Sequence, residues 1–312
     1  MTARRRSWRG LVTAVVTLAS AFTAACGATP TAGRSPAPAQ DTPALARLLR
    51  PGPAPQYYLA LGDSLSIGIQ PNPAGAGEPT ASAYPRQLDA MLRQAGSHLT
   101  LVQLGCSGET TRTMIRGGIC RYPRGSQLRE AVAFLRAHRH HVPLVTIDIG
   151  ANDPNHCIRT HGIAAVTCLT ASETRGIRDL NTIMAAVRSA AGPAVVIVGM
   201  TYYVPELGLW LAGRTGVGLA AVAEGLAAGY DRRLSGVYQR YGARVANVYA
   251  AFGSADFRHR AFLPGYGTVP KNVATICSLT WMCAPAPRGP NEHANAAGYR
   301  VIARAFLRSI TR

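Results

Sequence analysis

Residues 57–66 read YYLALGDSLS, an apolar run that ends at Gly62-Asp63 and is followed directly by Ser64. The run has the length and composition of a buried strand, and the Gly-Asp pair predicts a tight turn after it. Loops at the carboxyl ends of parallel strands converge on one crevice, where open α/β sheets bind ligands. From this stretch alone Ser64 is either a helix N-cap or, if a base lies nearby, a nucleophile.

The chain beyond this stretch alternates apolar runs with helical patterns. Strands are predicted at 99–104, 144–149, 194–200 and 244–249, and helices at 83–95, 127–136, 172–190, 219–241 and 296–310. Near-continuous apolar strands between helices are typical of a parallel sheet that is covered on both faces. The predicted fold class is therefore α/β, as one three-layer α/β/α domain over residues 56–312.

Small polar clusters follow the early strands, and one more precedes the last predicted helix. They contain Ser64, Gly108, Asn152 and His293, which we expect to meet at one edge of the sheet. Each has a purely structural alternative. Gly108 could serve a turn of positive φ, Asn152 begins a good turn sequence, and His293 could be a surface residue ahead of a helix.

Taken together and in order, these clusters resemble the motifs of the SGNH (GDSL) hydrolase superfamily. The matching residues are Gly62-Asp63-Ser64-Leu65-Ser66, Ser107-Gly108-Glu109-Thr110-Thr111, Gly150-Ala151-Asn152-Asp153, and His293 ahead of Ala296-Ala297-Gly298-Tyr299. The resemblance runs from about Tyr57 to the C-terminus. Within the superfamily, the chain is similar to the secreted actinobacterial lipases and esterases. The resemblance implies a flavodoxin-like fold and ester hydrolysis through an acyl-enzyme.

The resemblance also implies a role for each residue. Ser64 would be the nucleophile and His293 the general base that removes its proton. The backbone N–H groups of Ser64 and Gly108, with the side-chain amide of Asn152, would stabilise the oxyanion.

One position departs from the family pattern, which usually places an aspartate three residues before the histidine. Here that residue is Pro290. We therefore predict a Ser–His dyad whose imidazole is oriented by a backbone carbonyl of the loop preceding His293. Glu292 is the alternative orienting group.

The N-terminus carries a secretory signal over residues 1–26, with several arginines ahead of the apolar run 11–25. Thr23-Ala24-Ala25-Cys26 resembles the end of a bacterial lipoprotein signal, so two alternatives stay open for Cys26, a lipid anchor and an incidental cysteine. Residues 27–55 are rich in proline and alanine, which predicts a disordered linker. The protein is expected to be secreted, or held at the cell envelope through Cys26.

Six of the 7 cysteines follow Cys26, and an even number in an exported chain predicts disulfides. Pairing of sequence neighbours gives Cys106–Cys120, Cys157–Cys168 and Cys277–Cys283. The cysteines and histidines lack the spacing of a metal site, and we expect no metal and no cofactor.

The net charge is +18, carried almost entirely by dispersed arginines, and aromatic residues are only 7%. This composition argues against a nucleic-acid partner but favours anionic lipid or polymer surfaces, such as a membrane or cell wall. The predicted function is a monomeric secreted serine esterase or lipase acting on acyl-lipid or fatty esters. Alternatives are an acetyl esterase of carbohydrates and an inactive envelope-binding protein. Apolar residues also follow the strand predicted at 194–200, and two alternatives stay open for them. They either line a groove for the acyl chain or pack the crossover connection after that strand, and they are Leu207, Leu209, Trp210 and Leu211.

Overall fold

The structure is a computed structural model that describes residues 43–50, 54–159 and 162–311. Its centre is a five-stranded parallel sheet with the order β4-β1-β5-β6-β7. The strands are β1 (Tyr57–Gly62), β4 (Thr100–Gln103), β5 (Leu144–Asp148), β6 (Val196–Met200) and β7 (Arg244–Ala246). This is the flavodoxin-like strand order, whose ligand crevice lies where neighbouring connections diverge, beside the first strand.

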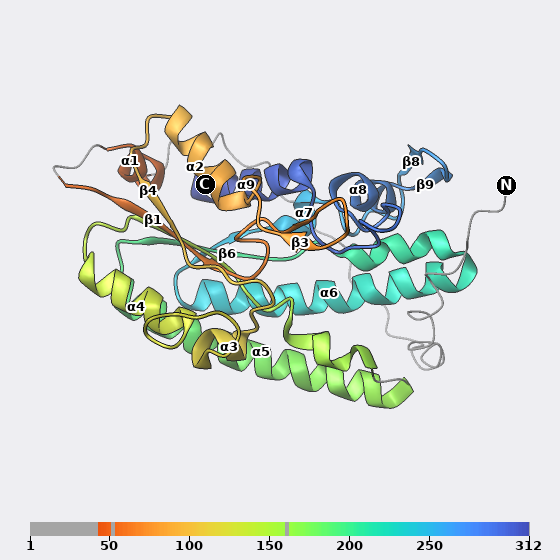
Figure 1. Cartoon of the computed structure of the whole chain (residues 1–312), viewed down its shortest axis with the longest axis horizontal. Coiled ribbons are helices and arrows are strands. Elements are labelled where there is room, and N and C mark those ends of the chain that lie inside the picture. Colours follow the sequence, from red (N-terminus) through yellow and green to blue (C-terminus); the bar gives the residue numbers. More distant parts are fainter. Residues whose placement is uncertain (1–42, 51–53, 160–161, 312) are drawn as a thin grey trace, which may run out of the picture.

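Helices cover both faces of the sheet, as Figure 1 shows. The alternation of side chains along β1 explains the two layers, because Tyr58 and Ala60 face one core while Leu59 and Leu61 face the other. The first core is closed by α2 (Tyr84–Gln94) and α9 (Ala296–Ile310), and the second by α4 (Gln127–Ala137), α5 (Gly162–Ala191) and the C-terminal half of α6 (Arg214–Arg240). The predicted three-layer α/β/α class is confirmed.

Other elements were outside the sequence prediction. They are α3 (Thr111–Arg116), α7 (Val248–Ala251), α8 (Lys271–Leu279), the 3-10 helices η2 (Asp153–Arg159) and η3 (Pro205–Ala212), and the hairpins β2 (Gln70–Pro71)–β3 (Gly77–Glu78) and β8 (Arg260–Leu263)–β9 (Gly267–Pro270). The strand predicted at 244–249 is shorter than expected. Asn247 ends it, because its side chain accepts a hydrogen bond from the Ala250 N–H at 2.9 Å and caps α7.

The linker prediction is wrong for residues 43–49, which form helix α1 (Pro43–Leu49). Leu48 is fully buried in the first core, and Arg47 donates a hydrogen bond to the carbonyl of Ala194 at 3.2 Å. A helix this short is unstable alone, so tertiary packing and not composition decides its structure. The predicted signal, Cys26 and the rest of the linker up to residue 42 lie outside the described residues. Within the described part of the chain, we find no helix whose length and apolar character would let it span a bilayer.

Candidate active site

Ser64 lies in the turn that follows β1. Gly62 ends that strand at φ 144°, and a Cβ there would come within 2.2 Å of an Asp148 carboxylate oxygen, so the turn requires glycine. The Gln127 side chain bridges both backbone groups of Gly62, at 2.7 Å and 3.0 Å. No helix begins at Ser64, and its hydroxyl lies 2.9 Å from His293 Nε2. The alternative of a helix cap is therefore excluded.

His293 lies in the loop directly before α9, far from Ser64 in sequence but beside it in space. Its side chain is 15% exposed, and this burial lowers the pKa of the imidazole, against the opposing effect of the Glu292 charge. The imidazole is therefore neutral at neutral pH. A neutral ring whose Nε2 faces the Ser64 hydroxyl can accept its proton.

The group that orients His293 is the side chain of Asn291, which corrects the prediction of a backbone carbonyl. The Oδ1 atom of Asn291 lies 2.8 Å from His293 Nδ1, and it also accepts the backbone N–H of His293 at 2.9 Å. Glu292, the predicted alternative, has its carboxylate 3.9 Å from Nδ1 on a side chain that is 69% exposed. The sequence did not indicate Asn291, because it lies two residues before the histidine, whereas the orienting residue of the family usually lies three before it.

Backbone hydrogen bonds fix the loop that carries Asn291 and His293. Trp281 donates its N–H to the His293 carbonyl at 3.0 Å and accepts the Asn291 N–H at 3.2 Å. Trp281 itself lies within the segment closed by the disulfide Cys277–Cys283. The disulfide therefore restrains Trp281, whose backbone hydrogen bonds hold the loop that carries the His293 imidazole.

Three donors lie on neighbouring loops at the same sheet edge. Gly108 has φ 78°, and nothing lies within 4 Å of the place a Cβ would take, so its N–H is sterically open. Among the described residues, neither this N–H nor that of Ser64 has a hydrogen-bond acceptor. Asn152 donates one amide hydrogen to the Glu109 carbonyl at 3.0 Å and accepts from Asn155 at 3.0 Å, which orients its amide. This set of donors suits a developing oxyanion.

A pair of buried carboxyl groups lies behind the Ser64 turn, and the sequence reasoning missed it. Burial raises the pKa of Asp63 to about 6, and burial together with the charge of Asp63 raises the pKa of Asp148. Asp148 also accepts the Tyr84 hydroxyl at 2.6 Å. The available signal was a carboxylate at the end of each of two adjacent apolar strands, β1 and β5.

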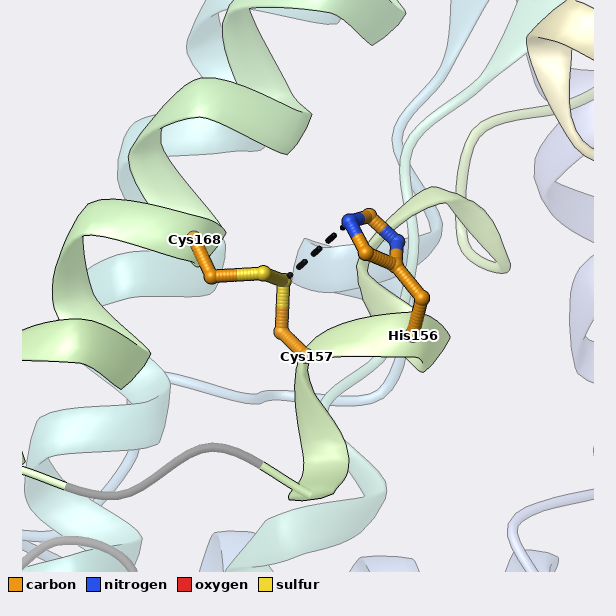
Figure 2. Close-up of side chains that lie close together, drawn as sticks. All are labelled: His156, Cys157 and Cys168. Atoms are coloured by element: carbon orange, nitrogen blue, oxygen red, sulfur yellow. Dashed lines mark hydrogen bonds between the residues drawn. A yellow bond between two sulfur atoms is a disulfide. The ribbon is translucent and has the colours of Figure 1, made fainter.

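The predicted disulfide pairing is confirmed for Cys106–Cys120, Cys157–Cys168 and Cys277–Cys283. Figure 2 shows the second of these beside the His156 ring, with His156 Nε2 3.6 Å from the Cys157 sulfur. These three residues form a cluster of metal-ligating side chains within the described chain. Because both sulfurs are in a disulfide, the cluster offers no thiolate to a metal.

Of the two alternatives for these four residues of η3, packing of the crossover holds for Leu207 and Leu209. Leu207 is fully buried and Leu209 is 8% exposed, so both pack the crossover after β6. Trp210 and Leu211 are only partly buried. For these two residues the alternative of an acyl-chain groove stays open.

Comparisons with known proteins place this geometry in context. The model of the GDSL-like lipase/acylhydrolase family matches residues 60–301. No curated protein matches the chain.

Several solved structures share the fold. Phospholipase A1 from Streptomyces albidoflavus is 20% identical, with a TM-score of 0.52 over 82% of this chain and 100% of that one. An extracellular lipase from Streptomyces rimosus is 19% identical, with a TM-score of 0.52 over 81% and 99%. A mutant acetyl-xylooligosaccharide esterase from Geobacillus is 16% identical, with a TM-score of 0.51 over 82% and 94%. Such low identities show a shared fold and leave the substrate open.

Proposed function

Because the chain belongs to the GDSL-like lipase/acylhydrolase family and is a carboxylic ester hydrolase, we propose that Ser64 is its nucleophile and His293 its general base. The observation that carries the assignment is the 2.9 Å contact between the Ser64 hydroxyl and His293 Nε2. The contact has the nucleophile–base geometry that acyl transfer requires.

In the first half of the reaction, Ser64 Oγ attacks the ester carbonyl carbon while its proton moves to His293 Nε2. The N–H groups of Ser64 and Gly108 and the amide of Asn152 donate to the tetrahedral oxyanion. The intermediate collapses when His293 gives the proton to the departing alcohol, which leaves an acyl-enzyme on Ser64. Water then attacks the acyl carbon while its proton moves to His293, and His293 returns this proton to Ser64 Oγ as the acid leaves.

Asn291 is the positioning residue in this proposal. Its Oδ1 accepts the Nδ1–H of His293, which holds the tautomer whose Nε2 faces Ser64. An amide oxygen is neutral, so it orients the imidazolium that forms during acylation without the full charge of a carboxylate. The hydrogen-bonded chain of side chains in this proposal is Ser64–His293–Asn291.

We further propose that the enzyme is exported and hydrolyses acyl-lipid or fatty esters. Export is supported by the basic and apolar N-terminal segment and by the three disulfides, which persist in oxidising compartments. A phospholipase and a lipase are among the proteins that share the fold. Anchoring through Cys26 is a further part of this proposal.

The decisive experiment is hydrolysis of p-nitrophenyl esters from acetate to palmitate by wild type and Ser64→Ala. Turnover should fall to background in Ser64→Ala and stay at the wild-type level in Ser107→Ala, whose exposed hydroxyl lies beside Gly108. A long-chain optimum supports the lipid substrate, and an acetate-only preference would favour acetylated carbohydrate. Residual turnover in folded Ser64→Ala would overturn the nucleophile assignment.

A further inference from the structure

The β8–β9 hairpin projects from the body of the molecule beside α8, as Figure 1 shows. Phe262 on β8 is 75% exposed, and Tyr266 in the turn between the strands is 52% exposed. Phe262 is the most exposed of the large hydrophobic side chains in the described chain. Two exposed aromatic rings at one tip leave apolar surface that no other part of residues 43–50, 54–159 and 162–311 covers.

Cationic side chains surround the base of the same hairpin. Arg258, Arg260 and Lys271 are all exposed. Asp256 is the single acidic residue between positions 255 and 271, and it contacts His259 Nδ1 at 2.9 Å. The hairpin therefore presents an aromatic tip above a positively charged base.

We propose that this hairpin docks the enzyme on an anionic lipid surface. Phe262 and Tyr266 would enter the boundary between head groups and acyl chains, where aromatic rings are favoured, and the three cations would meet the head groups. Docking of a second copy on this face is disfavoured, because two chains of net charge +18 would bring the same cations together. Charge complementarity instead favours an anionic membrane.

Two contacts of Arg260 fix the hairpin in place. The Arg260 guanidinium lies 5.7 Å from the centre of the Trp210 ring on η3, and it donates to the Thr268 carbonyl at 2.9 Å. The first contact ties the hairpin to the crossover after β6, and the second ties its two strands together.

The position of the hairpin also links it to the site. It follows β7 at the carboxyl edge of the sheet, the edge that carries Ser64, and β9 continues through Pro270 into α8. The residue after α8, Thr280, pairs with Ala294, the neighbour of His293. Docking through the tip would thus bring a lipid surface to the edge of the sheet where the site opens. This catalytic consequence rests on the proposed function, whereas the binding itself does not.

The test measures binding of full-length Ser64→Ala protein to vesicles, with Cys26→Ser added so that no lipid anchor contributes. Vesicles of phosphatidylcholine mixed with phosphatidylglycerol should co-sediment with the protein, and pure phosphatidylcholine should bind it more weakly. Phe262→Ser with Tyr266→Ser should weaken binding by roughly tenfold or more, the loss expected when one or two rings no longer enter an apolar phase. Leu226→Ser, which removes a 49%-exposed apolar side chain from α6, is the matched control and should bind like the parent.

Three results would overturn the proposal. The first is equal vesicle binding by the double variant and the parent, with binding removed by salt alone, which would indicate attraction without insertion. The second is equal weakening by Leu226→Ser. The third is a dimer in analytical ultracentrifugation that the double variant abolishes, which would assign the tip to a second copy. Hydrolysis of soluble p-nitrophenyl acetate by the wild-type chain is the separate readout, and its failure would affect the proposed function and leave the binding result standing.

Discussion

The Nδ1 atom of His293 lies 2.8 Å from the Oδ1 atom of Asn291, whose backbone N–H is bonded in turn to the Trp281 carbonyl at 3.2 Å. An amide thus occupies the place where a catalytic histidine more often meets a carboxylate. An amide oxygen fixes the ring and its tautomer, but it stabilises the imidazolium less than an anion does. This difference leads to two separable predictions, one about rate and one about pH.

Replacement of Asn291 by alanine should lower kcat with little effect on KM. The lost hydrogen bond acts on a ring that, in the proposed mechanism, becomes charged during acylation, and such bonds contribute about 1.5–3 kcal/mol, or roughly 10–100-fold in rate. Steady-state kinetics on a soluble ester measures the change. Glu292→Gln is the matched control and should keep the wild-type kcat. A loss in Glu292→Gln as large as that in Asn291→Ala would transfer the orienting role to the carboxylate.

Replacement of Asn291 by aspartate should retain activity and move the acid limb of the pH profile upward. A carboxylate in contact with Nδ1 favours the imidazolium and raises the pKa of His293, by about one to two units on the usual scale of such pairs. The proposed general base must be neutral to accept a proton, so the variant should lose activity at a higher pH than wild type. The measurement is kcat/KM against pH for both proteins, and superimposable profiles would contradict a direct contact.

The wild-type enzyme itself should remain active in mildly acidic solution. Burial lowers the pKa of His293 below its ordinary value of 6.5, so protonation of the free base begins only at a lower pH. The acid limb of kcat/KM should therefore have its midpoint below 6.5. A midpoint above that value would show that the Glu292 charge outweighs burial.

Asn152→Ala should cost about 10²–10³ in kcat, the usual loss for one oxyanion donor. Asn155→Ala is the control, because the exposed Asn155 side chain donates to Asn152 Oδ1 at 3.0 Å and leaves the Asn152 amide hydrogens untouched. Its effect should be much smaller. If the two variants lost activity equally, the loop conformation and not the amide donor would be the cause.

The sequence predicted the fold well because the fold depends on local pattern, and the motifs that resemble the family supplied the four proposed site residues. Buried strands such as β6, whose residues are Val-Ile-Val-Gly-Met, contain no polar side chain, and parallel strand ends must share one edge. Asn291 could not be predicted in the same way. Its contact with His293 depends on the path of the loop between α8 and α9, which Trp281 sets through hydrogen bonds that no residue spacing reveals.

The elements that the sequence missed share a physical cause. Helix α1 and the β8–β9 hairpin are too short for a periodic pattern, and each is stabilised by a tertiary contact. For α1 this is the burial of Leu48, and for the hairpin it is the contact of Arg260 with Trp210. For Leu207 and Leu209 the sequence left two alternatives open for a related reason, because apolar composition does not distinguish a groove from a packed crossover.

Removal of the disulfide Cys277–Cys283 by a double serine variant should lower kcat even at a temperature where the variant is fully folded. The chain-entropy model gives about 2 kcal/mol for so short a loop, which a folded domain can tolerate. The same loop, however, contains Trp281, whose backbone bonds hold Asn291 and His293. Activity and circular dichroism of the variant should be compared at a temperature where it is folded. Full activity in the folded variant would show that the hydrogen bonds of Trp281 suffice alone.

The buried pair Asp63 and Asp148 should make the protein less stable as the pH rises from about 4 to 7. The pKa of Asp63 is raised from its ordinary 3.8 to about 6, so the folded chain binds protons more tightly than the unfolded chain. This stabilising contribution is fully present below the ordinary pKa and is lost as the pH rises through the folded one.

Asp63→Asn should flatten that dependence, because it removes one titrating group and the charge that raises the pKa of Asp148. The Asn oxygen can still accept the Leu65 N–H, a bond of 3.0 Å in the parent. Thermal unfolding of wild type and variant between pH 4 and pH 7 measures the slope, with Glu78→Gln as a control that changes an exposed carboxylate. Parallel slopes for wild type and Asp63→Asn would show that Asp63 stays ionised throughout, despite its burial.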